Sequence, residues 1–296
     1  MHAAALRLSL LPLIALTCPA AAQQSGSDTI NVIGRKPEEA RKEAQDFVRK
    51  MGVTERPVAR WVEPICPHVF GVAPEIGKRV TDRIHVVARD VKIAVAKEPC
   101  RANVILSFAS DGAALVREIA RKAPGKLAEV SAEDRPALLT GDAPIRWWHA
   151  TDTRTKDGMA GTGNEQPPFA QLDGPGGVPM AGDVHFQYRS SIVSTQMVRV
   201  LKGATIIIDA NRAAGTSLDS VAAFASLIAL AEVQPNDEAP AQSILSLFKT
   251  GGPTDLTSID RSFLRALYRL PLDRTALAQR GLLVKGLLAS AGQSDE

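Results

Sequence analysis

The spacing of apolar side chains along this chain predicts a series of helices. In several stretches the apolar residues recur every three or four positions, as on one face of a helix, and a capping residue, proline or glycine marks the ends. One further stretch, residues 218–233, is apolar almost all round, so we expect a central helix that the rest of the fold buries. The predicted amphipathic helices are residues 37–51, 74–96, 111–123, 258–268 and 275–289.

Shorter apolar or alternating runs predict strands between these helices. The segment 194–202 fits either a strand or a helix. Strands interspersed with helices indicate an α+β fold, in which a mixed sheet packs against the buried central helix. The predicted strands are residues 29–33, 103–108, 145–150, 185–193 and 204–209.

Composition divides the chain into four regions. Residues 1–22 read as a signal peptide, and residues 23–150 as an N-terminal α/β region. Residues 151–182 are rich in glycine and proline, so we expect a long loop that is mobile or faces a partner. Residues 183–296 form the C-terminal region.

The first residues carry the pattern of a secretory signal. Residues 8–18 are apolar but too few to span a bilayer as a helix, which argues against the alternative of a membrane anchor. Ala20, Ala21 and Ala22 supply a small-residue cleavage pattern, so we expect the mature chain to begin at Gln23. We therefore expect a periplasmic or secreted protein, with no transmembrane segment after cleavage.

The charge pattern narrows the class of partner. The formal net charge is only +3, and positive and negative side chains are interspersed, as in Arg41-Lys42-Glu43. This is typical of a solvated surface and not of a basic stripe that binds nucleic acid. We expect no nucleic-acid partner; an envelope protein or a peptide fits better.

Two cysteines, Cys66 and Cys100, stay in the predicted mature chain. An even number in an exported protein predicts a disulfide, the alternative being two buried thiols. A helix over residues 74–96 would be about 33 Å long. The flanking residues reach about 41 Å, so the two Cα atoms can meet at bonding distance.

The layout of residues 217–268 resembles the active-site helix, turn and closing helix of the metzincin zinc proteases. The resemblance is carried by the apolar helix, by Ser243-Ile244-Leu245 and by Leu256-Thr257-Ser258-Ile259-Asp260 with Tyr268. It implies a metzincin-like C-terminal half. An ordinary buried helix followed by a capped helix explains the same pattern.

The chemical positions of that motif are all replaced. A metzincin site needs two histidines one helical turn apart, a glutamate beside the first and a third ligand after a turn. Laying the motif on this chain puts Phe224 and Ile228 at the histidines, Ala225 at the glutamate and Gln234 at the third ligand. The resemblance thus implies a scaffold without its zinc site, and we expect no metal or other cofactor.

The whole mature chain also resembles an uncharacterised family of exported proteins from Gram-negative bacteria. The resemblance implies export and a shared fold, and no particular chemistry. It rests on Gly34-Arg35-Lys36-Pro37-Glu38, Pro64-Ile65-Cys66-Pro67, Pro99-Cys100-Arg101-Ala102-Asn103 and Ile208-Asp209-Ala210-Asn211.

One region offers groups for acid–base or metal chemistry. His149 and His185 lie on predicted strands that flank the glycine-rich stretch, with Asp152 and Asp183 close in sequence. Solvated or core-edge histidines are the alternative. Trp147 and Trp148 point to opposite faces of a strand, so we expect one of them in the core. The other, for which Trp148 is the candidate, is either exposed beside this site or covered by the glycine-rich loop.

These patterns predict a non-catalytic binding or interaction module on a degenerate hydrolase-like scaffold. The alternative is a divergent hydrolase or peptidase that uses the region of His149, Asp152 and His185.

Overall fold

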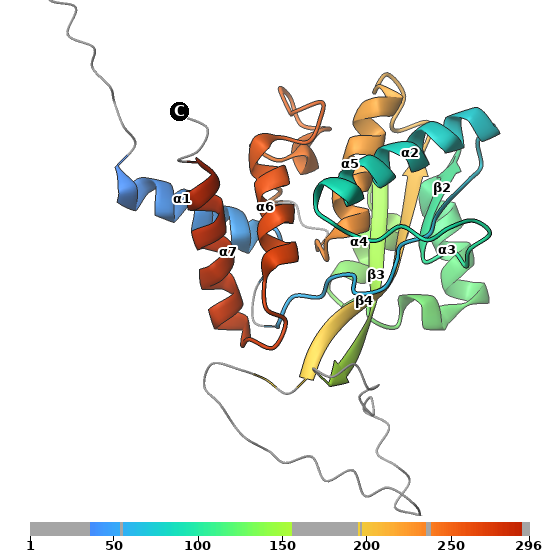
Figure 1. Cartoon of the computed structure of the whole chain (residues 1–296). Helices are drawn as coiled ribbons and strands as arrows, with labels where there is room; N and C mark the ends of the chain where they lie inside the picture. The colour runs from blue at the N-terminus through green and yellow to red at the C-terminus, as the bar shows by residue number, and fades with distance from the viewer. Residues whose placement is uncertain (1–35, 54–55, 156–194, 196, 235–237, 292–296) are drawn as a thin grey trace, which may run out of the picture. The chain divides into compact units, whose positions relative to one another are not determined.

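The computed structural model describes residues 36–53, 56–155, 195, 197–234 and 238–291. Within them the chain forms a four-stranded sheet and helices on both of its faces (Figure 1). The strands, in sheet order, are β1 (Pro67–Phe70), β2 (Val104–Ala109), β4 (Met197–Asp209) and β3 (Ile145–Thr155). The helices are α1 (Pro37–Lys50), α2 (Pro74–Asp90), α3 (Gly112–Lys122), η1 (Pro124–Leu127), α4 (Asp134–Thr140), α5 (Leu218–Leu230), η2 (Ile244–Ser246), α6 (Ser258–Arg269) and α7 (Ala276–Ala291).

The sheet is mixed, which confirms the predicted α+β class. β1, β2 and β4 run parallel, and β3 pairs with β4 in the antiparallel sense. Parallel neighbours need a crossover, and α2 provides it between β1 and β2.

Alternation along the strands gives the sheet two buried faces. Trp147, Ile206, Leu106 and Val69 lie in one row across the strands and belong to the main core, together with α2 and α5. The opposite face packs against α3, η1 and α4 in a smaller core. That second core contains Val116, Leu127, Leu138, Trp148 and Ile207.

The buried central helix is confirmed as α5. Its residues from Ser220 to Leu230 are all buried, including Phe224, Ala225 and Ile228. Ser217 caps its start by accepting a hydrogen bond from the Ser220 backbone N–H, but the helix ends at Leu230, short of the predicted residue 233.

Helices α1, α6 and α7 pack together and complete the main core. The rings of Phe47 in α1 and Phe263 in α6 meet edge to face, with centroids 5.9 Å apart. Thr257 and Asp260 form a capping box at the start of α6, because each side chain accepts a hydrogen bond from the backbone N–H of the other.

Two strand boundaries differ from the sequence predictions. β3 continues to Thr155, so residues 151–155 belong to a strand and not to the predicted loop. β4 begins at Met197, which settles most of segment 194–202 as strand. The predicted strands 29–33 and 185–193, and residues 156–182 of the loop, lie outside the described residues.

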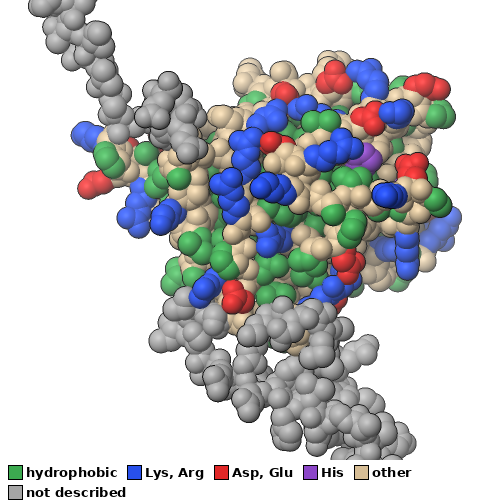
Figure 2. Space-filling model, viewed as in Figure 1, with side chains coloured by type: hydrophobic (Ala, Val, Ile, Leu, Met, Phe, Trp, Pro, Cys, Tyr) green, Lys and Arg blue, Asp and Glu red, His purple; other side chains and the backbone are tan. Residues whose placement is uncertain are grey.

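The predicted Cys66–Cys100 disulfide is present, with the two Cα atoms 6.2 Å apart. In the part of the chain that the structure describes, no helix combines the length and apolar character needed to cross a bilayer. On the face shown in Figure 2, Lys and Arg side chains are spread widely, with Asp and Glu side chains among them. Several form ion pairs between elements, such as Arg79–Asp219 and Arg265–Asp90, both at 2.9 Å.

Candidate functional site

The structure separates the residues of the predicted histidine site. His149 and Asp152 both lie on β3, but Asp152 forms an ion pair with Arg154 at 3.2 Å. Asp183 and His185 lie outside the described residues. Among the residues described, the site is therefore reduced to His149 and its immediate neighbours.

His149 binds the end of helix α5. Its Nε2 lies 2.8 Å from the carbonyl oxygen of Ile228, and because a carbonyl only accepts, Nε2 carries the proton. Ile228 is in the last turn of α5, where carbonyls lack partners within the helix. Burial lowers the pKa of His149 more than the bond to Ile228 raises it. A neutral ring in this position acts as a helix cap.

Two other side chains share this capping. The indole N–H of Trp61 donates to the carbonyl of Ala229, and the hydroxyl of Tyr268 donates to that of Leu230, each over 2.7 Å. Burial raises the pKa of the Tyr268 hydroxyl far above its ordinary range, so it stays a donor. His149, Trp61 and Tyr268 thus each donate a hydrogen bond to a carbonyl at the end of α5.

An enclosed ion pair fixes the segment that follows α5. Arg199 on β4 binds both carboxylate oxygens of Glu232, at 2.9 and 2.7 Å. The same carboxylate accepts the Ala59 N–H at 3.1 Å, and Arg199 also donates to the Pro57 carbonyl. The pair thus ties β4 to two chain segments.

Trp147 and Trp148 are both buried, so Trp148 is not exposed beside the predicted site. Trp147 packs in the main core and its indole N–H donates to the Val233 carbonyl over 2.8 Å. Trp148 is only 5% exposed, because α3, η1 and α4 cover it.

His149, Glu232 and Gln234 border a cavity of about 70 Å³. That space holds a few waters but is well below the size of ordinary ligand pockets. Gln234, which the sequence resemblance assigns to the third metal ligand, lies beside Gly52: a Cβ on that glycine would come within 3.0 Å of the Gln234 backbone nitrogen.

A larger groove lies on the sheet face that carries the second core. The groove lies over the part of the sheet that contains Ile105, Ala150, Gly203 and Thr205. Its volume is about 680 Å³, within the range of ligand pockets. Its floor includes Ile105 and Thr205, which share a row with Trp148, and the small residues Ala150 and Gly203.

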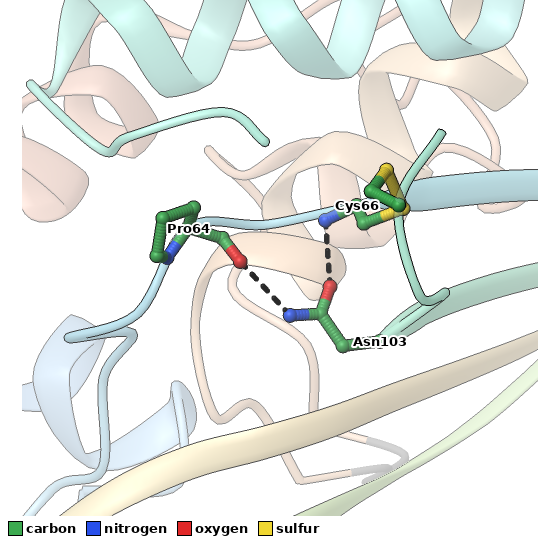
Figure 3. The surroundings of a disulfide bond; sticks show 4 residues. Pro64, Cys66 and Asn103 are labelled. Carbon is green, nitrogen blue, oxygen red and sulfur yellow. Dashed lines mark hydrogen bonds between the residues drawn. A yellow bond between two sulfur atoms is a disulfide. The ribbon is translucent and has the colours of Figure 1, made fainter. Parts of the chain in front are cut away.

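Asn103 lines one wall of the groove. It lies next to the Cys66–Cys100 disulfide, to which its hydrogen bonds connect it (Figure 3). Asn103 Oδ1 accepts the Cys66 backbone N–H at 2.7 Å, and Nδ2 donates to the Pro64 carbonyl at 3.0 Å. Because Asn103 precedes β2 and Cys66 precedes β1, these bonds fix the wall to the sheet.

Some charged side chains of the groove have partners of opposite charge, and others have none. Glu63 forms ion pairs with Arg154 at 2.7 Å and Lys202 at 3.1 Å, which together lower its pKa. In contrast, the exposed Arg101 and Lys126 form no ion pair and no side-chain hydrogen bond with any residue that the structure describes. The groove therefore presents two unpaired cations.

Sequence reasoning missed this groove, although it noted the Pro-Cys-Arg-Ala-Asn segment that contains Arg101 and Asn103. No local pattern marks the groove, because its existence depends on how far the helices extend over the sheet. Comparisons with protein-family models, with curated proteins and with solved structures found no match.

Proposed function

We propose that the protein is an exported, non-catalytic binding module that takes an acidic, extended peptide segment in the groove. The observation that carries this proposal is the open groove of about 680 Å³ with its unpaired Arg101 and Lys126. A floor of Ile105, Thr205 and small residues offers apolar contact to a chain, while the cations favour carboxylates.

Several observations favour binding over catalysis. His149 is hydrogen-bonded to the Ile228 carbonyl at the end of α5, and Asp152 forms an ion pair with Arg154. The positions that the metzincin resemblance assigns to zinc and base, Phe224, Ala225 and Ile228, are buried and apolar. We infer that α5 and α6 keep a metzincin-like frame that now serves packing. The alternative remains a hydrolase that acts through His149.

Export is tested on the protein isolated from its source cells. We expect the periplasmic or secreted fraction to contain a chain beginning at Gln23, by intact mass and N-terminal sequencing. A cytoplasmic protein that retains Met1 contradicts the proposal.

Binding is tested by fluorescence polarisation with labelled short peptides, each acidic sequence matched to a version with Asn and Gln in place of Asp and Glu. The acidic peptides should bind more tightly, and added salt should weaken them because exposed charges are screened. The double variant Arg101→Glu, Lys126→Glu should lose about tenfold or more in affinity.

The control is Arg121→Glu, an exposed arginine of α3 that does not line the groove, and it should bind like the wild type. Equal binding of the matched peptides, or an unaffected double variant, argues against the groove. Cleavage of the peptides that His149→Asn abolishes would instead support the hydrolase.

A further inference from the structure

We propose that Cys66, His68 and Cys100 form a zinc site when their disulfide is reduced. The ligand atoms of these residues, the two Sγ and a ring nitrogen of His68, all lie within 4.8 Å of one another. The three residues do not line the groove, so this inference stands independently of the proposed peptide binding.

The backbone brings the three side chains together for simple reasons. Residues two apart in an extended chain point to the same side, which places Cys66 and His68 together at the start of β1. Cys100 arrives from the segment that leads into β2, the strand paired with β1. The three ligands therefore lie near the N-terminal ends of two paired strands.

Hydrogen bonds, in addition to the disulfide, hold the chain on either side of Cys100 against Ile65 and Cys66. Asn103 N–H donates to the Cys66 carbonyl at 3.2 Å, and the Cys66 N–H donates to Asn103 Oδ1 at 2.7 Å. Ile65 exchanges two backbone bonds with the segment after α2: its N–H donates to Ala94 and its carbonyl accepts from Ala96, both at 2.9 Å. Reduction should therefore leave the two cysteines adjacent.

The donor set fits zinc. Two thiolates and an imidazole form a known zinc ligand set, with ligand atoms about 2.0–2.3 Å from the ion in a tetrahedral arrangement. Such ligand atoms lie roughly 3.5–3.8 Å apart by that geometry, so the present cluster needs only small side-chain rotations. The fourth position is left to water or another ligand.

The change from the disulfide to the zinc-bound state begins with a thiol–disulfide exchange. A dithiol reductant attacks a sulfur of the Cys66–Cys100 bond; Cys100 is the more exposed of the two cysteines. The reductant becomes a disulfide, and Cys66 and Cys100 become thiols. Zinc then displaces two protons, one from each thiol, as both bind as thiolates. Disulfide and zinc are thus mutually exclusive.

The test uses the full chain, reduced by a phosphine that is converted to its oxide, then desalted without oxygen. Titration with Zn²⁺ against a chromogenic chelator should show one tight site per reduced chain and none in the oxidised protein. Co²⁺ should give the near-ultraviolet charge-transfer absorption of thiolate ligands. His68→Asn should weaken zinc binding about tenfold or more and leave the thiols intact.

His85→Asn is the control, because His85 lies on α2 and outside the cluster; it should bind zinc like the wild type. Circular dichroism of the reduced protein should stay native. Absence of stoichiometric zinc in the reduced chain, equal affinity of His68→Asn, or unfolding on reduction would each overturn the proposal.

Discussion

At the scale of the residue, Glu232 forms an enclosed ion pair with Arg199. Its side chain is 16% exposed and that of Arg199 is 15% exposed. Burial by itself raises the pKa of Glu232, but the hydrogen bonds and charge of Arg199 outweigh it, so the pKa lies below its ordinary value of 4.5. The folded state therefore favours the ionised carboxylate.

Glu232→Gln should lower the free energy of unfolding by about 3 kcal/mol at neutral pH, because it leaves the Arg199 charge without its partner. A carboxylate with a depressed pKa contributes its full stability above the unfolded value and loses it as pH falls through the folded value. The difference between wild type and variant should thus shrink below about pH 4.5.

Urea denaturation at several pH values measures this effect. Glu118→Gln is the control, since Glu118 makes only an exposed pair with Lys122 one helical turn away, and it should change stability little. A Glu232→Gln difference that stays constant from neutral to acid pH would contradict the assignment.

The pairing of Arg199 with Glu232 could not be predicted from the sequence. Arg199 and Glu232 are 33 positions apart and fall next to each other only because α5 returns along β4. The disulfide was predictable, because an even cysteine count in an exported chain leaves few alternatives. His149 carried no such signal: its carbonyl partner is a backbone atom, invisible in a pattern of side chains.

At the scale of the element, α5 shows how a helix that is apolar on every side is used. Phe224 meets the rings of Trp147 and Phe248 edge to face, with centroids 5.7 and 5.9 Å away. Ser226 avoids an unsatisfied hydroxyl by donating to the Ala222 carbonyl. Because α5 is apolar on every side, the sequence predicted its burial, and the structure confirms it.

Phe224→Ala should cost about 3–5 kcal/mol of unfolding free energy, because the side chain is buried in the core and its truncation leaves a cavity there. Thermal or denaturant unfolding measures the loss. Leu277→Ala on α7 is the matched control, since Leu277 is 72% exposed and should have almost no effect. Equal stability of the two variants would show that α5 is not the centre of the core.

At the scale of the whole molecule, the elements were more predictable than their arrangement. Helix positions followed from periodicity, with errors at the ends, such as residue 96 for a helix that stops at Asp90. The sheet order and the groove depend on contacts between distant segments. Trp148 illustrates the limit: alternation placed it on the correct face, but the helices that cover that face are set by tertiary packing.

The strand order also dictates when the sheet can form during synthesis. Among the strands that the structure describes, β4 is the last along the chain, yet it lies inside the sheet between β2 and β3. Until the ribosome has released residues 197–209, β3 has no partner and β2 has only one. Sheets that depend on such distant pairings fold slowly. A chain with this topology completes its sheet only late in synthesis, which is compatible with the proposed export.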